Sequence, residues 1–574
     1  MILQALKEYY DRKAADPESQ MAPPGFEWKE IPYVVVITPD GAPAMLAATY
    51  EGFGKARRAK RHLVPQAVKR ASGIAANLLW DNPEYALGVV LKGKPERVKE
   101  QHAAFKKRIE DLGELSDSSI EALRLFLGNP DKAALLQPFG EAWQKALEEG
   151  ANISFQLAGE KGLITESPKV RHAIVEALLG NAEAKGICLV TGEEDIPERL
   201  HAAIKGVWGA QSTGANIVSF NLAAFGSYGK DQGANAPVGK SAAFAYTTAL
   251  NHLLGKDSKQ RMQVGDASTI FWSERSTAFE QQVPDFFTEP PKDDPDRNVR
   301  AVESLFKSVH SGTRPGDEDK SRFYVLGLAP NASRISIRFW VIDTVKGMSD
   351  KICRYFDDIC IAHGPRDRDV LSLFRLLVST ATLGKADNIP PNLAGDTMRA
   401  ILEGTPYPQT LLQGAIRRIR AEQDVTYPRA AMIKACLNRS LRFNNPTHER
   451  ELAMSLDISN TNIGYLLGRL FSVLEKVQQE SNPGINATIR DRFYGAASGT
   501  PVTVFPNLMR LKNHHLSKLE NTGRRIYFER LVGDIVAGFA DFPPHLSLAD
   551  QGRFAIGYYH QNQDFFTKKT ENNG

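Results

Sequence analysis

The chain has 574 residues, of which 42% are hydrophobic and 24% are charged, and its formal net charge is +4 at pH 7. This length exceeds one ordinary core and predicts two to four domains. No apolar run approaches the roughly 18 residues of a membrane span, and the N-terminal helical pattern differs from the apolar core of a signal peptide. The sequence therefore excludes a membrane protein and predicts a cytoplasmic one.

The cysteines and histidines form no pattern typical of a metal site. The four cysteines have the spacing of neither a zinc site nor a disulfide framework, so we expect core thiols in a reducing compartment. They are Cys188, Cys353, Cys360 and Cys436. The twelve histidines are scattered along the chain, and we expect no metal and no cofactor.

The first half of the chain mixes strand and helix patterns. After a helix at the N-terminus, "YVVVITPDGAPAMLAATY" predicts a β-hairpin that turns at Asp40-Gly41. The run "KARRAKRHLVPQAVKR", residues 55 to 70, holds seven Lys or Arg and no acid, so it is either a solvated face or a track for phosphates. Helices are predicted from about Lys94 to Glu149, and strands at "NISFQLAG", "GICLVTGE" and "NIVSFN".

A second hairpin is predicted further along, after a possible Pro- and Asp-rich linker at 284–298. In "SRFYVLGLAPNASRISIRFWVID" we expect the turn at Pro330-Asn331. Alternation predicts an apolar face of Ile335, Ile337 and Phe339 and a basic, aromatic face of Arg334, Ser336, Arg338 and Trp340. The second face is typical of a nucleic-acid platform or of a solvated strand.

Helices dominate after about residue 343. "NIGYLLGRLFSVLEKVQ" places its apolar residues on one stripe and ends at Asn482-Pro483-Gly484. The predicted fold class is α+β, with a mixed N-terminal region of β-hairpins and helices followed by a C-terminal helical bundle. We expect an α+β region over 1–342, a helical connector over 343–430 and a bundle over 431–574.

The sequence contains no convincing catalytic motif. "GANAPVGKS", residues 233 to 241, resembles a Walker A phosphate loop, but five residues rather than four separate Gly233 from Gly239. Pro237 also lacks an amide that a phosphate cradle would use. We therefore expect a non-catalytic protein, and the alternative is a nuclease or nucleotide hydrolase that uses this loop near Lys240.

Three loops combine amides, hydroxyls and glycines. They are "KRASGIAAN", "GVWGAQSTGAN" and "SYGKDQGANAPV". Such residues allow a close backbone approach and offer neutral donors and acceptors, which suits base edges, although each loop alone is typical of a buried turn network. With the basic run, they favour nucleic-acid recognition.

The same stretches resemble the large subunit of the type I-C CRISPR surveillance complex, Cascade. "MILQALKEYY", "VPQAVKRASGIAANLLWDNPEYALG", "CLVTGE", "AIKGVWGAQSTGANIVSFN", "AFAYTTALNHLL" and "FYVLGLAPNASRISIRFW" look like that family, in order. The resemblance implies a non-catalytic subunit that reads a short, TTC-like protospacer-adjacent motif in duplex DNA and helps to open the duplex. It also implies binding to guide crRNA, to the displaced single strand, to the backbone and small subunits, and to a separate helicase-nuclease. The C-terminal bundle resembles the small subunit.

We assign candidate contacts within these segments. The candidates for reading the flanking motif are Lys69, Arg70, Ser72, Asn77, Trp208, Gln211, Ser212, Thr213, Asn216, Lys230, Gln232 and Asn235, with Asn77 first. The candidates for binding phosphates are Lys55, Arg57, Arg58, Lys60, Arg61, Arg334, Arg338, Arg524 and Arg525. A stand-alone single-strand-binding protein built on the basic bundle is a further alternative.

Overall fold

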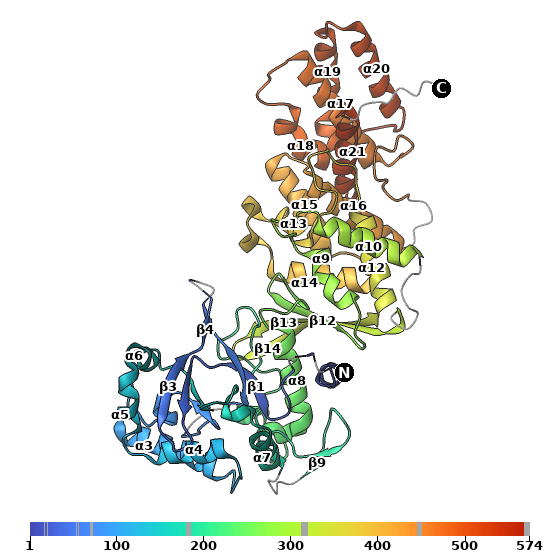
Figure 1. Ribbon diagram of the computed structural model, residues 1–574. Coiled ribbons are helices and arrows are strands. Elements are labelled where there is room, and N and C mark those ends of the chain that lie inside the picture. Colours follow the sequence, from blue (N-terminus) through green and yellow to red (C-terminus); the bar gives the residue numbers. More distant parts are fainter. Residues whose placement is uncertain are drawn as a thin grey trace. The chain divides into compact units, whose positions relative to one another are not determined.

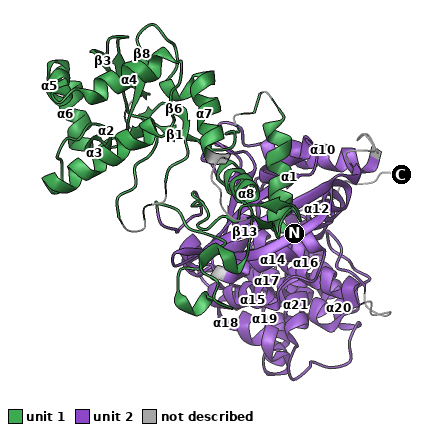
Figure 2. Cartoon of the chain, turned by 90° about the horizontal axis from the view of Figure 1, so that it is seen from below, with its two compact units in different colours: residues 1–205, 212–252 green, residues 206–211, 253–574 purple. Residues whose placement is uncertain are grey.

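We describe the protein from a computed structural model, which covers residues 1–16, 18, 19, 21–52, 54, 57–68, 70, 73–179, 185–311, 319–444 and 450–566. The chain folds into two units, coloured separately in Figure 2: unit 1 holds residues 1–205 and 212–252, and unit 2 holds 206–211 and 253–574. The α+β class is confirmed. The boundaries expected at 342/343 and 430/431 fall inside unit 2, because strands and helices there share one core.

Unit 1 is built on a four-stranded sheet of order β3-β2-β8-β7, in which β2 and β8 are parallel and the other pairs antiparallel. The first predicted hairpin is confirmed as β2 and β3. Smaller two-stranded sheets join β1 to β6, β4 to β5 and β9 to β10. The strands are β1 Phe26–Glu30, β2 Tyr33–Ile37, β3 Pro43–Ala48, β4 Tyr50–Glu51, β5 Arg58–Ala59, β6 Arg61–Pro65, β7 Trp80–Asp81, β8 Ile153–Leu157, β9 Gly186–Ile187 and β10 Glu194–Asp195.

Helices cover the sheet of unit 1 and bury its apolar residues. Val35 and Phe155 on neighbouring strands pack in one core with Phe105 and Phe126 from two of these helices. The helical stretch predicted from about Lys94 to Glu149 is confirmed, and it is divided into several helices, one of which ends at Gly128. The helices are α1 Ile2–Ala14, α2 Pro83–Ala86, α3 Pro95–Glu110, α4 Ser118–Gly128, α5 Lys132–Leu136, α6 Gly140–Glu149, α7 Pro168–Leu179 and α8 Lys240–Leu253.

Unit 2 begins with an antiparallel sheet of order β11-β12-β13-β14, formed by β11 Arg261–Val264, β12 Ala267–Ser273, β13 Arg322–Asn331 and β14 Arg334–Thr344. The second hairpin is confirmed, but Asn331 pairs with Arg334, so the turn falls at Ala332-Ser333, two residues later than predicted, with Ala332 at φ 52°. A register shift at Gly327/Leu328 also breaks the predicted alternation. As a result, Phe339 is buried whereas Ile337 is 43% exposed.

The rest of unit 2 is helical, as Figure 1 shows in its yellow to red segments. The expected linker at 284–298 is partly wrong, because residues 284–287 lie in α9 and Phe286 and Phe287 are buried in the core. The helices are α9 Phe279–Phe287, α10 Arg297–Ser311, α12 Val345–Ile359, α13 Leu373–Val378, α14 Pro391–Glu403, α15 Gln409–Glu422, α16 Tyr427–Asn444, α17 Ile463–Ser481, α18 Ile489–Gly499, α19 Phe505–Ser517, α20 Thr522–Val536 and α21 Leu548–Phe566.

Glycines allow α17 and α21 to pack backbone against backbone. A Cβ at Gly464 or Gly468 of α17 would overlap the carbonyl of Asp550 or Phe554, and a Cβ at Gly557 of α21 would overlap that of Tyr465. The opposite side of α21 packs on α16. The last helix therefore joins the bundle to the preceding helices of unit 2.

A buried carboxylate joins α12 to α16. Asp358 accepts a hydrogen bond from Arg439 Nε at 2.7 Å, a second from Arg442 and a third from the Tyr407 hydroxyl at 3.3 Å. Lys434 donates to the Asp358 carbonyl at the end of α12. Because a buried charge is stable only when it is paired and hydrogen-bonded, this cluster fixes how the two helices meet.

Two local expectations are wrong. The stretch 216–221, "NIVSFN", forms no strand; the isolated bridge of Ile204 to Ala215 directly precedes it, and the Asn216 side-chain amide donates to the carbonyls of His201 and Ala202. Cys360 is exposed, since it directly follows the end of α12, while the other three cysteines are buried as expected. Among the described residues, no helix combines the length and apolarity needed to cross a bilayer.

We predict opposite effects for two glycine substitutions in the bundle. Gly468→Ala should lower the free energy of unfolding of unit 2 by about 1–3 kcal/mol, because the new methyl forces α17 away from α21. Gly533→Ala in α20 should raise it by about 0.4–1 kcal/mol, since nothing lies within 4 Å of the added Cβ. Denaturant titration monitored by circular dichroism measures both, and equal effects would contradict the helix contact.

Acid should destabilise unit 1 through His102. Its Nδ1 lies 2.9 Å from the Tyr85 carbonyl and its Nε2 is buried, and burial lowers its pKa to about 4. The unfolded chain, with a His pKa near 6.5, therefore binds the proton more readily, and stability falls as the pH drops from about 6.5 towards 4. At pH 5 the loss is about 2 kcal/mol.

The measurement compares denaturant unfolding at pH 7 and pH 5. His102→Leu should flatten the pH dependence, whereas the same change at exposed His172 should not. An unchanged pH dependence in His102→Leu would show that this imidazole is not the acid-sensitive group.

Candidate nucleic-acid interface

The basic run forms an arm of unit 1. Strands β4 and β5 pair through Tyr50 with Ala59 and Glu51 with Arg58, and they extend beyond the sheet on the side away from α3 and α4 (Figure 1). The Arg57 guanidinium lies 4.1 Å from the centre of the Tyr50 ring. The Tyr50 hydroxyl donates to Glu149 of α6 at 2.6 Å, which ties the arm to the helix below.

Four cations of this arm are exposed and uncompensated. They are Arg57, Arg58, Lys60 and Arg61, and within the described part of the chain none of them forms an ion pair. By contrast, the exposed Arg300 of α10 pairs with Asp294 at 2.7 Å. Lys55, also predicted to bind phosphate, lies outside the described residues. The arm therefore offers positive charge that phosphates can neutralise.

The segment 66–81 follows the arm directly and is held by a buried carboxylate. Asp81 is 1% exposed and accepts hydrogen bonds from the Arg70 side chain and from the backbone N–H groups of Asn77 and Asn82, at 2.9 Å each. Burial raises the pKa of the Asp81 carboxyl, and these donors oppose the rise. Arg70 also lies 4.0 Å from the ring centre of Tyr85. The exposed Arg70 thus fixes the loop to the buried Asp81 and to Tyr85.

Asn77, the first choice for reading a base, is 5% exposed in this structure. Its Oδ1 accepts the Val68 backbone N–H at 3.0 Å, which closes the loop across its base. Trp80 Nε1 adds a bond to the Pro65 carbonyl at 2.8 Å. This geometry favours a positioning role for Asn77. Lys69 and Ser72, two further candidates for reading the flank, lie outside the described residues.

A second polar loop of unit 1 is built around Asn235. Its Oδ1 accepts the Ser227 N–H at 2.9 Å, and its Nδ2 donates to the carbonyls of Lys230 and Gln232 at 3.0 Å each. The Lys230 side chain is exposed, whereas Gln232 lies in a 3-10 turn with φ 45° and its Oε1 is buried. Asn235 therefore shapes the loop and leaves Lys230 at its surface.

The stretch 206–221 is divided between the units. Gln211 belongs to unit 2, and Ser212, Thr213 and Asn216 belong to unit 1. The first three are exposed, while Asn216 is 8% exposed and bonded to backbone carbonyls. Asn216 thus resembles Asn77 and Asn235 in stabilising a loop.

Trp208 of unit 2 lies at the turn end of the β11–β14 sheet. It is 65% exposed, its backbone N–H donates to Ser268 Oγ at 2.9 Å, and neighbouring Gly209 lies against Pro330. Arg338 on β14 is exposed but pairs with Asp266 of the β11–β12 turn at 2.5 Å, and Arg334 is half-buried. The structure therefore brings an exposed indole and two arginines to one sheet.

The arginines predicted in the bundle differ in their surroundings. Arg524 makes two hydrogen bonds to Glu480, at 2.9 and 2.6 Å, and its guanidinium lies 4.5 Å from the Phe528 ring centre. Arg525 is half-buried on the same helix. Because Arg524 is already paired, it is a weaker candidate for binding phosphate than the cations of the arm.

The Walker-like segment binds a carboxylate of the protein itself. Asp195 accepts hydrogen bonds from the Ser241 N–H at 3.0 Å and the Ser241 hydroxyl at 2.6 Å, at the N-terminus of α8. A Cβ at Gly239 would overlap Asp195, which explains the glycine. A phosphate cradle would need this position, so the geometry favours a helix cap.

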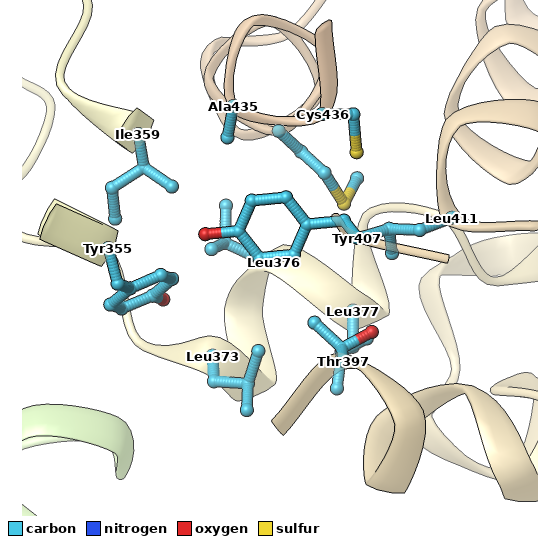
Figure 3. A pocket seen from close by; sticks show the side chains of 11 residues that line it. Tyr355, Ile359, Leu373, Leu376, Leu377, Thr397, Tyr407, Leu411, Ala435 and Cys436 are labelled. Atoms are coloured by element: carbon cyan, nitrogen blue, oxygen red, sulfur yellow. The ribbon is translucent and has the colours of Figure 1, made fainter. Parts of the chain in front are cut away.

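The cavity shown in Figure 3 lies in the helical core of unit 2 and is lined by apolar and aromatic side chains, among them Tyr355, Leu376, Tyr407 and Cys436. Burial raises the pKa of the Cys436 thiol to about 12, which keeps it protonated and unreactive. The cavity has the character of a packing defect rather than of a nucleotide site.

One exposed aromatic residue is not among the candidates selected from the sequence. Tyr228 is 97% exposed, beside the predicted Lys230. The dipeptide Tyr228-Gly229 between Ser227 and Lys230 carries a turn signal, but the signal does not tell which way the tyrosine points.

Comparison with protein families matches residues 6–566 to the family described as "CRISPR-associated protein (Cas_Csd1)". No curated protein matches the chain. The family match spans both units.

We predict that Asn77→Ala lowers stability and affinity together. Losing the Oδ1 acceptor leaves the Val68 N–H without its partner, which should lower the free energy of unfolding by about 1–3 kcal/mol and loosen loop 66–81. DNA affinity should then fall for matched and altered flanks alike. Thermal unfolding and DNA titration check this; unchanged stability with a selective loss of flank preference would instead mean direct base reading.

Proposed function

The chain belongs to the Cas_Csd1 family of CRISPR-associated proteins, and from this membership we propose that it is the large subunit of a type I-C Cascade complex. In this role it reads a TTC-like flanking motif in duplex DNA, helps to open the duplex for R-loop formation and recruits a separate helicase-nuclease. The guide crRNA reads the remaining sequence by base pairing. Its partners are the backbone and small subunits, the target duplex and the displaced strand.

The observation that carries the proposal is the continuity of the arm and loop 66–81 in unit 1. The exposed Arg57, Arg58, Lys60 and Arg61 have no ion-pair partner among the described residues, and β6 leads from them into a loop fixed by Asp81 and Asn77. Phosphate contacts hold a protein in register on DNA, and a fixed loop can then reach the base edges. This combination supports reading of a short duplex flank.

The C-terminal helices α17–α21 support a contact with single-stranded nucleic acid. Arg510 on α19, Lys518 directly after α19 and Arg530 on α20 are exposed. Such a basic surface can follow the backbone of a displaced strand without reading its sequence.

The proposal also assigns no catalysis to this chain. The Asp195 carboxylate at the N-terminus of α8 supports this, because it competes with any phosphate for the Ser241 N–H and hydroxyl. The alternative hydrolase predicts DNA or ATP turnover by the isolated chain that is lost in Lys240→Ala or on chelation.

The test assembles the chain with its partner subunits and a guide, and compares affinity for matched duplexes with intact or scrambled flanking bases. We expect tighter binding with the intact flank and no cleavage by the complex itself. Equal affinity for both duplexes would overturn flank reading, and turnover sensitive to Lys240→Ala would favour the hydrolase.

We predict that the arm contributes affinity without sequence preference. In the same assay, Arg57→Ala combined with Arg58→Ala should weaken binding to both duplexes and reduce the slope of log affinity against log salt by about 2, because two phosphate contacts are lost. The matched control is Arg300→Ala, since Arg300 is exposed but paired with Asp294. An unchanged salt slope in the double variant would remove the arm from the DNA contact.

A further inference from the structure

Tyr228 occupies the tip of a tight turn in unit 1. Ser227 and Lys230 form an isolated antiparallel bridge, with the Lys230 N–H donating to the Ser227 carbonyl at 2.9 Å. Tyr228 and Gly229 between them have φ of 52° and 67°, the signs of a type I′ turn. The turn therefore directs the Tyr228 side chain outward, where it is 97% exposed.

The turn is held from below by one side chain. Asn235 accepts the Ser227 N–H and donates to the Lys230 carbonyl, so it binds both ends of the four-residue turn. A third hydrogen bond, to the Gln232 carbonyl at 3.0 Å, fixes Asn235 itself. Tyr228 is thus presented on a pre-organised support rather than on a freely moving loop.

Folding alone does not account for tyrosine at this position. A positive φ is unfavourable for a residue with a Cβ, and Asn or Gly is preferred where both central residues of a turn need it. At 97% exposure the ring gains almost no burial that could offset this. Backbone strain of this kind concentrates at functional sites. Among the described non-glycine residues with positive φ, Gln232 and Leu79 also lie in the two polar loops of unit 1.

We propose that Tyr228 is a stacking platform for an unpaired nucleobase. Both faces of the exposed ring are open to a base, and the exposed Lys230 two residues later can meet the adjacent phosphate. The inference rests on the proposed function, which supplies unpaired bases from two sources: DNA opened beside the flank, and the guide RNA. The chemistry that Tyr228 recognises is the same in both.

The experiment uses the assembled complex with three variants. Tyr228→Asn removes the ring but retains a residue that tolerates positive φ, so the turn is kept. Tyr228→Phe retains stacking, and Leu222→Ala is the matched control, since Leu222 is 59% exposed on the same loop but is not aromatic. 2-Aminopurine is placed at single positions of the DNA next to the flank and, in a separate experiment, at single positions of the guide RNA.

We expect Tyr228→Asn to weaken binding of the DNA or RNA strand whose base stacks on the ring by about 5- to 100-fold. The fluorescence of one 2-aminopurine should rise in this variant and stay quenched in Tyr228→Phe and Leu222→Ala. A rise in fluorescence with the labelled DNA or with the labelled guide RNA supports the platform and identifies which strand supplies the base. If Tyr228→Asn has wild-type affinity and wild-type fluorescence with both the labelled DNA and the labelled RNA, the stacking platform is overturned.

The two proposals fail in different ways. If the wild-type complex does not discriminate between flanks, the proposed function fails, whatever Tyr228→Asn does. If the complex discriminates normally and Tyr228→Asn leaves both probes and both affinities unchanged, only the stacking platform fails.

Discussion

The backbone contact between α17 and α21 is the constraint on which unit 2 depends. Gly464, Gly468 and Gly557 allow the two helices to approach until carbonyls of one occupy the space of absent side chains on the other. Since α21 is buried on several sides and also packs on α16, the last helix of the chain completes a core that begins at the β11–β14 sheet. The bundle and the sheet are for this reason one unit.

Charge pairing decides which of the many cations can meet a nucleic acid. The net charge is only +4, and several arginines of unit 2, such as the exposed Arg300 and Arg338 and the half-buried Arg524, already have carboxylate partners. The arm of unit 1 differs because the described cations Arg57 and Arg58 have no such partner. A locally uncompensated field attracts phosphates even when the whole protein is nearly neutral.

The sequence predicted the hairpins, the helices of the second half and the α+β class, because turn residues and apolar periodicity are local signals. It could not predict where the polar loop residues point. Asn77, Asn216 and Asn235 were all candidates for base contacts, yet each bonds backbone groups of its own loop. Irregular backbone inside a protein must satisfy its N–H and C=O groups, and asparagine does so without a charge. Conversely, nothing in the sequence distinguishes Tyr228 from a buried aromatic residue, and only the structure shows that it lies at a turn with positive φ and faces solvent.

These asparagines have a functional consequence. A loop whose ends are fixed by side-chain hydrogen bonds loses less conformational entropy on binding than a free loop of the same length, so more of its contact energy contributes to affinity. In unit 1 this applies both to segment 66–81, closed by Asn77 and Asp81, and to the turn held by Asn235. Under the proposed function, the residues that meet the nucleic acid are expected at the tips of such loops and the buried amides at their bases. This arrangement explains why a loop can be rich in amides although few of them are free to contact a base.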